Sequence, residues 1–288
     1  MVFGTNRRTF VIIWFSMLYT PQQTASFFDY ALTHLKVTQQ DHVLTLTLAR
    51  SEKKNALNGL LLRELAFALN YAHYEKEVWM LILAAEGNVF CAGMDLGKMG
   101  EEESFQTQIP APSGSIRLGE LFTNLHKPCV ARVQGAVLAG GFLLVGGCSQ
   151  VIAAENTTFS LPEVKRGLFP FQVLATLLEI MSARQALDLC MRASTLSAIE
   201  AQELGLVTEV VKAGNLDEAV QKYTDELKKM SPSAIRLGLR AYQEMKSVPS
   251  AQCHEFLYDQ LQIALQTADA KEGIAAFLEK REAKWQNE

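Results

Sequence analysis

The feature that most constrains the fold of this chain is a change in apolar periodicity near residue 170. Before it, apolar runs of strand length alternate with helical stretches and Gly-bearing loops, whereas from Phe171 the periodicity is helical almost throughout. Val43–Ala49 alternates apolar residues with Thr, as a half-buried strand does, and Asn58 opens a helix that continues to about Tyr74. An alternating first part followed by helices predicts an α/β core with a helical C-terminal region.

Further strands are expected at Val78–Ala84, Cys129–Val133 and Val151–Ala154, with a helix over Ser115–Leu125 and a loop over Gly87–Lys98. These short apolar runs are typical of buried strands, which extends the α/β prediction through the first half of the chain.

Two capping boxes are expected in the C-terminal region. Ser197 with Glu200 has the required spacing, and Gly205 suits the end of the helix that follows. Asp269 with Glu272 predicts a second box.

These patterns divide the chain into an N-terminal extension (1–28), a core (29–215) and a C-terminal helical region (216–288). The extension has no Asp or Glu, and its two adjacent arginines precede an apolar run too short to span a bilayer. It is a targeting segment, a membrane-touching extension, or translation from too early a start with Met17 as the true initiator. The last is favoured because the globular pattern begins only near Ala31. We expect a cytoplasmic protein, or one of an organelle matrix if 1–28 is a transit segment.

Composition excludes several classes of function. Apolar residues make up 49% and charged residues 20% of the 288 residues, as in globular proteins, and the formal net charge is −4. A chain without a basic surplus is not expected to bind nucleic acid. The five cysteines are scattered without a CxxC spacing, which favours reduced thiols and gives no metal site.

Two Gly-bearing segments each follow a strand and precede a helix. In Phe90–Leu96, Gly93 allows a tight turn that leaves peptide N–H groups free to face a ligand oxygen. In Gly135–Phe142, Gly140 and Gly141 open the start of a helix, where N–H groups lack partners. Taken alone, the first segment is better explained as an ordinary turn and the second as close helix packing on small residues. Together they predict an oxyanion hole, with two amides aimed at one oxygen.

Glu163 is the candidate acid–base residue. It follows Pro162 and has apolar neighbours on both sides in Phe159–Val164, so partial desolvation should raise its pKa and suit it to general base or acid catalysis. The alternative for a lone Glu is a solvated carboxylate paired with Lys165 or Arg166.

These three segments, together with Arg50–Leu57 and Ala270–Arg281, stand in the order of the crotonase (enoyl-CoA hydratase/isomerase) family, and the chain resembles that family from about residue 35 to the C-terminus. The resemblance implies the crotonase ββα spiral with a helical C-terminal region, an acyl-CoA substrate, and trimers or hexamers built as dimers of trimers. Coenzyme A would be carried by the substrate, so no separate cofactor is expected.

The resemblance also implies roles for single residues. Met94 and Gly140 match the two amides of the oxyanion hole, which hold a thioester carbonyl as its enolate forms, and Glu163 matches the second of two catalytic glutamates. The remaining matches concern coenzyme A: Lys53 and Lys54 near its phosphates, Ala92 in the adenine and pantetheine cleft, and Phe277 and Lys280 closing over it, often from a neighbouring subunit.

One position departs from the family. The first catalytic glutamate of the hydratases falls three residues after Gly140, where this chain has Leu143, and no Asp or Glu occurs between Glu120 and Glu155. Two carboxylates orient and deprotonate water in a hydration, whereas one base suffices to move a double bond. The departure therefore slightly favours an isomerase, and leaves open decarboxylation, other enolate chemistry or a non-catalytic acyl-CoA-binding paralogue. A serine hydrolase is disfavoured because the chain has no G-x-S-x-G.

Overall fold

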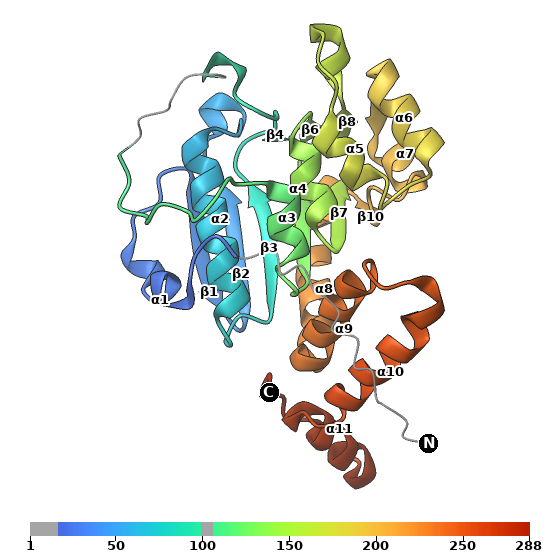
Figure 1. The fold of residues 1–288 in the computed structure, drawn as a ribbon. Helices are drawn as coiled ribbons and strands as arrows, with labels where there is room; N and C mark the ends of the chain where they lie inside the picture. Colours follow the sequence, from blue (N-terminus) through green and yellow to red (C-terminus); the bar gives the residue numbers. More distant parts are fainter. Residues whose placement is uncertain (1–16, 99–105) are drawn as a thin grey trace, which may run out of the picture.

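The computed structural model describes residues 17–98 and 106–288. The predictions of a targeting segment or a membrane-touching extension concern mainly residues 1–16, which lie outside the described residues. The expected α/β core with a helical C-terminal region is confirmed (Figure 1).

Two sheets form the core of the described part of the chain. The large sheet consists, in sheet order, of β1 (Leu35–Gln40), β2 (Val43–Leu48), β3 (Met80–Ala85), β5 (Cys129–Val133), β7 (Gln150–Ala154) and β10 (Glu209–Val211). The small sheet consists of β4 (Val89–Cys91), β6 (Ala136–Leu138), β8 (Thr158–Ser160) and β9 (Thr195–Ser197). Only the β1–β2 and β8–β9 pairs of these sheets are antiparallel.

The chain builds the two sheets in repeated steps. Each of the pairs β3–β4, β5–β6 and β7–β8 places its first strand in the large sheet and its second in the small one. The Gln134 side chain, between β5 and β6, donates to the carbonyls of Ala85 and Gly87 at 2.8 and 3.0 Å. It thereby connects the β5–β6 turn to the β3–β4 turn. At the same corner a Cβ on Gly135 would come within 2.2 Å of the Asn88 carbonyl oxygen, so no other residue fits there.

Helices cover both faces of the large sheet (Figure 1). The longest, α2, is buried along most of its length, and α8 packs on the other face through Leu216 and Val220 against Val130 and Ile152. The α-helices are α1 (Pro21–Thr24), α2 (Gly59–Tyr74), α3 (Leu118–Thr123), α4 (Gly141–Gly147), α5 (Phe171–Leu177), α6 (Ala183–Arg192), α7 (Ala198–Glu203), α8 (Leu216–Lys228), α9 (Pro232–Met245), α10 (Cys253–Ala264) and α11 (Ala268–Glu279). The 3₁₀ helices are η1 (Phe27–Asp29), η2 (Ser51–Lys53), η3 (Leu96–Lys98), η4 (Pro162–Arg166), η5 (Ala213–Asn215) and η6 (Ser250–Gln252). None of the helices in the described residues is both long and apolar enough to cross a membrane.

The packed structure begins earlier than Ala31. Tyr19 and Phe27 are buried, with ring centroids 5.0 Å from Phe67 and 4.5 Å from Tyr71. The end of the predicted extension therefore packs on α2 as part of the hydrophobic core. Sequence periodicity missed this because Tyr19 and Phe27 lie in short apolar runs that follow neither the helical nor the strand period.

Several short strands were not predicted. β4 lies inside the expected loop, while β9 and β10 lie in the region expected to be helical. Strands of three residues are too short to show a period of two. β1 was also missed, because Leu35 and Val37 are its only apolar residues.

One predicted capping box is confirmed and the other is wrong. Ser197 and Glu200 form the reciprocal box that starts α7, and Gly205 follows that helix with φ +81°. α11 is capped instead by Thr267, whose hydroxyl accepts from the amide of Ala270 at 3.0 Å. Asp269 is fully buried in the first turn of α11. Its carboxylate accepts hydrogen bonds from the Ser231 hydroxyl and the Ser233 amide, at the start of α9, and so connects the two helices.

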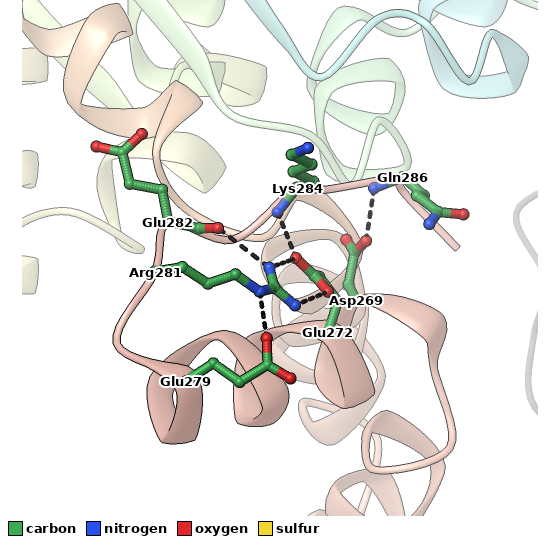
Figure 2. Close-up of polar contacts among 7 residues, drawn as sticks. All are labelled: Asp269, Glu272, Glu279, Arg281, Glu282, Lys284 and Gln286. Carbon is green, nitrogen blue, oxygen red and sulfur yellow. Dashed lines mark hydrogen bonds and ion pairs between the residues drawn. The ribbon is translucent and has the colours of Figure 1, made fainter.

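The chain folds back over α11 after the helix ends (Figure 2). Arg281 makes a bidentate ion pair with Glu272 at 2.6 and 2.9 Å, and the amide of Gln286 donates to Asp269 at 2.7 Å. Residues 282–288, the C-terminal tail, then reach the core, where Asn287 donates to the carbonyl of Lys76 at 2.8 Å. The tail thus fixes α11 relative to the core.

Candidate active site

The three segments singled out in the sequence leave one edge of the small sheet. β4, β6 and β8 are parallel neighbours, with Cys91 paired to Val137 and Leu138 paired to Ser160. Because the carboxyl ends of parallel strands meet at one edge, the loops that follow all emerge there. Those loops contain Met94, Gly140 and Glu163.

The Met94 and Gly140 backbones approach each other closely. A Cβ built on Gly140 would lie 3.7 Å from the backbone nitrogen of Met94 and 3.7 Å from a side-chain carbon of Leu57. Neither the Met94 amide nor the Gly140 amide donates a hydrogen bond to another described residue. Two unused donors at one strand edge are the arrangement that an oxyanion requires.

The turn geometry explains this close approach. Gly93 has φ +86°, and a Cβ there would lie 2.6 Å from the Cβ of Ala139 and 3.1 Å from the nitrogen of Gly140. Ala139 itself has φ +50°, a left-handed conformation that is unfavourable for a residue with a side chain. Its amide is fixed by the carbonyl of Ser160 at 3.0 Å, which helps to hold the turn before α4.

An ion pair supports the Met94 turn from a distant part of the sequence. The buried Arg50 side chain donates to Asp95 at 2.8 Å and to the carbonyl of Ala56 at 2.9 Å. The hydrogen bond from Arg50 lowers the pKa of Asp95. Leu57 continues the link, donating to the carbonyl of Gly93 and accepting from the amide of Asp95. Sequence reasoning missed this pair because its partners are 45 positions apart (95 − 50).

Glu163 lies in η4, directly after Pro162. One of its carboxylate oxygens, Oε2, is buried and has no hydrogen-bond partner among the described residues. Burial raises the pKa of this carboxyl group, opposed by the hydrogen bond from its own backbone amide and by the charge of Arg166. A desolvated carboxylate with an unused oxygen can accept a proton from a ligand near neutral pH.

Leu143 occupies the third position of α4, and its amide donates to the carbonyl of Gly140 at 3.1 Å. Its side chain is 8% exposed. The helix therefore offers a nearly buried apolar group where the resembling hydratases carry a carboxylate.

The residues predicted to contact coenzyme A fall into two groups. Lys53 and Lys54 are exposed at the end of η2, and the carbonyl of Lys54 accepts from the amide of Ala92 at 3.0 Å, so these three lie beside the Met94 turn. Phe277 and Lys280 are exposed at the end of α11, at the opposite end of the molecule from the small sheet (Figure 1). A single chain does not bring this second pair to the candidate site.

Comparison with known proteins agrees with this fold. The Enoyl-CoA hydratase/isomerase family profile matches residues 38–288. The mevalonyl-coenzyme A hydratase of Aspergillus fumigatus is 31% identical over 251 residues, which cover 85% of this chain and 91% of that protein. The 2,3-dehydroadipyl-CoA hydratase of Escherichia coli is 28% identical, covering 87% of this chain and 97% of that protein.

Solved structures show the same architecture. The crystal structure of an enoyl-CoA hydratase/isomerase from Mycobacterium paratuberculosis superposes with a TM-score of 0.79 at 28% identity, covering 90% of this chain and all of that one. This confirms the predicted spiral core with C-terminal helices. Sequence and fold agree, and the chain belongs to the enoyl-CoA hydratase/isomerase (crotonase) family.

Proposed function

We propose that this protein is an acyl-CoA-processing enzyme that stabilises a thioester enolate. The observation that carries the proposal is the buried, unbonded Oε2 of Glu163 in the loop beside the free amides of Met94 and Gly140. A non-catalytic acyl-CoA-binding paralogue has no use for a desolvated carboxylate, which costs stability. A non-catalytic acyl-CoA-binding protein is the alternative to an enzyme.

The residues suit proton transfer next to a thioester. The amides of Met94 and Gly140 would donate to the thioester oxygen, and the charge that develops there would be stabilised without reorganisation of solvent. Glu163 would take a proton from C2 of a 3-enoyl-CoA and return it at C4, giving the 2-enoyl isomer. Lys53, Lys54 and Ala92 would contact the coenzyme A part of the substrate.

Leu143 slightly favours isomerisation over hydration. An apolar side chain cannot accept a hydrogen bond from water, so only Glu163 remains to orient and deprotonate it. Relatives named as hydratases make hydration the direct alternative, and decarboxylation is a third enolate reaction open to one carboxylate.

The decisive experiment compares both reactions on one preparation, with a 3-enoyl-CoA as isomerase substrate and crotonyl-CoA as hydratase substrate. Isomerisation should be the faster reaction. Hydration at about 10 s⁻¹ or more without detectable isomerisation would remove the isomerase preference. Absence of both activities, with no heat on adding acetoacetyl-CoA, would remove the acyl-CoA proposal itself.

A Leu143→Glu variant tests the cause of the preference. If the cleft otherwise suits water, the second carboxylate should raise the hydration rate, measured with crotonyl-CoA. An unchanged rate in a folded variant that still binds acyl-CoA would assign the pocket to other enolate chemistry.

Assembly and location complete the proposal. Phe277 and Lys280 lie far from their own chain's site, which favours a trimer or a dimer of trimers in which a neighbour supplies them. The cytoplasm is the expected location. An organelle matrix is the alternative, in keeping with a rat relative, 27% identical, that is named as mitochondrial.

A further inference from the structure

Basic side chains from three elements meet on α9, away from the strand edge that carries Glu163. α9 contributes Arg236 and Arg240, one helical turn apart and therefore on one face. His73 comes from the last turn of α2, and His126 and Lys127 come from the segment between α3 and β5. We call these five residues the basic cluster.

The members of the basic cluster lie close to one another. The rings of His73 and His126 are 5.7 Å apart, and the Lys127 ammonium donates to the carbonyls of Ala72 and Glu75. Burial, and then the charges of His73, Arg240 and Arg236, lower the pKa of His126 to about 4. Every charged neighbour that acts on this imidazole is thus basic.

The acidic groups nearby leave hydrogen-bond donors of this cluster unused. Glu244 makes an ion pair with Arg240, 3.7 Å from its Nε, but that nitrogen is buried and donates no hydrogen bond to a described residue. Asp269 acts on Arg236 but is already bonded to Ser231, Ser233 and Gln286.

Glu75 acts on Lys127, whose ammonium is already bonded to two carbonyls, and its own carboxylate accepts from the amide of Glu77. The side chains of Arg236 and His126 make no hydrogen bond or ion pair with any other residue that the structure describes.

We propose that His126, Arg236 and Arg240 form a second binding site, for a doubly charged oxyanion of the phosphate or sulfate class. Such an anion would accept from the two guanidinium groups and from the imidazole, in the geometry that arginine offers to tetrahedral oxyanions. It would also offset the like charges of the Arg236 and Arg240 guanidinium groups. The site is separate from the proposed acyl-CoA site.

Calorimetric titration of the full chain with sodium sulfate, at ionic strength held constant with sodium chloride, tests the site. Saturable binding is expected, and each of Arg236→Gln and Arg240→Gln should weaken it about tenfold or more, because each loses charge-assisted hydrogen bonds. Arg192→Gln on the exposed face of α6 makes the same charge change elsewhere and should bind as the native protein does. Equal affinity in all four proteins, or no saturable heat in any, would overturn the proposal.

The pH dependence separates a built site from general attraction. Sulfate keeps its charge between pH 7.5 and 5.5, whereas His126, whose pKa is lowered to about 4 in the free protein, would gain a proton beside the bound anion. Affinity should therefore rise as pH falls across this range, and His126→Gln should flatten the rise. A steep rise that persists unchanged in His126→Gln would remove the imidazole from the site.

Further measurements identify the source of the anion and keep the two proposals apart. If coenzyme A displaces sulfate, the phosphoryl group belongs to the substrate carrier; if inorganic phosphate alone does, the ligand is a free anion. Glu163→Gln should bind sulfate normally, and Arg236→Gln should turn over enoyl-CoA normally, so either proposal can fail alone.

If Arg236→Gln changes only the oligomeric mass and sulfate never binds, a partner's carboxylate fills the cluster and the anion site is wrong.

Discussion

Glu163 carries most of the proposed chemistry, since it is the one acidic residue that the sequence match places at the site. Its buried oxygen is unbonded, and burial raises its pKa. A group whose pKa is raised in the folded state stabilises that state when protonated and loses this contribution as pH rises through the folded pKa. The native protein thus gives up some stability at neutral pH to hold an ionised base.

Glu163→Gln should lower kcat by about 10²–10⁴-fold, because Gln cannot accept the proton, and leave the affinity for acetoacetyl-CoA unchanged. The native pH–rate profile should fall on the acid side at a pH above the usual carboxyl range. Turnover of 3-enoyl-CoA and calorimetry on one preparation check both statements. At pH 7.5 the variant should melt no lower than the native protein, and a lower melting temperature would mean that the carboxylate is structural.

At the scale of elements, the site depends on contacts between loops that follow different strands. Arg50 at the start of η2 holds Asp95 just after Met94, and Ser160 in β8 holds Ala139 just before Gly140. The turn that we propose to bind the thioester oxygen therefore has two supports, one from η2 and one from β8.

Asp95→Asn should weaken the first support. The buried Arg50 guanidinium would lose its charged partner, at a cost of about 1–3 kcal/mol in unfolding free energy, measured by urea denaturation. Because the pKa of Asp95 is lowered in the folded state, this contribution exists above the ordinary carboxyl pKa and disappears as pH falls through the lowered value. The difference between native and variant proteins should thus shrink below about pH 4. A Glu52→Gln variant, altered at an exposed acid in the same loop, is the control.

The sequence predicted several helices and strands better than the contacts that hold them together. β5 and α2 were found almost residue for residue because their apolar patterns are long enough to read. β4, β6 and β8 are too short for that, and their pairing depends on residues far apart in the chain. The same applies to Arg50 with Asp95. For Asp269 the sequence predicted a local contact that is absent. Its spacing from Glu272 fits a capping box, but its buried carboxylate bonds to Ser231 and Ser233 instead.

At the scale of the whole molecule, two remote segments complete the structure. The N-terminal residues Tyr19 and Phe27 pack on α2, and the C-terminal tail ties α11 to the core. The site itself would be complete only in an assembly, if the proposal for Phe277 and Lys280 holds.

A chain that begins at Met17 should melt like the full-length protein, whereas one that begins at Ala31 should lose its cooperative transition. The second chain lacks Tyr19 and Phe27, and removal of a buried aromatic side chain costs about 3–5 kcal/mol. Differential scanning calorimetry of the three proteins makes the comparison. Loss of several degrees in the Met17 chain would show that residues 1–16 contribute to folding.

Lys280→Ala should weaken coenzyme A binding in the assembled protein, and high salt should reproduce part of the loss because the contact is between exposed charges. Calorimetric titration with free coenzyme A measures it. Lys222→Ala on the exposed face of α8 is the matched control and should leave the affinity unchanged. Equal binding in both variants would exclude Lys280 from the coenzyme A site.

The contact between Asn287 and Lys76 spans 211 positions, which has a consequence for synthesis in the cell. At about 5–20 residues per second, roughly 10–40 s pass between the synthesis of Lys76 and the synthesis of Asn287. Most of that interval passes before α10 and α11 exist, so the core around Lys76 is made well before the helices and the tail that dock on it. The contact that fixes α11 can therefore form only after residues 282–288 have been translated.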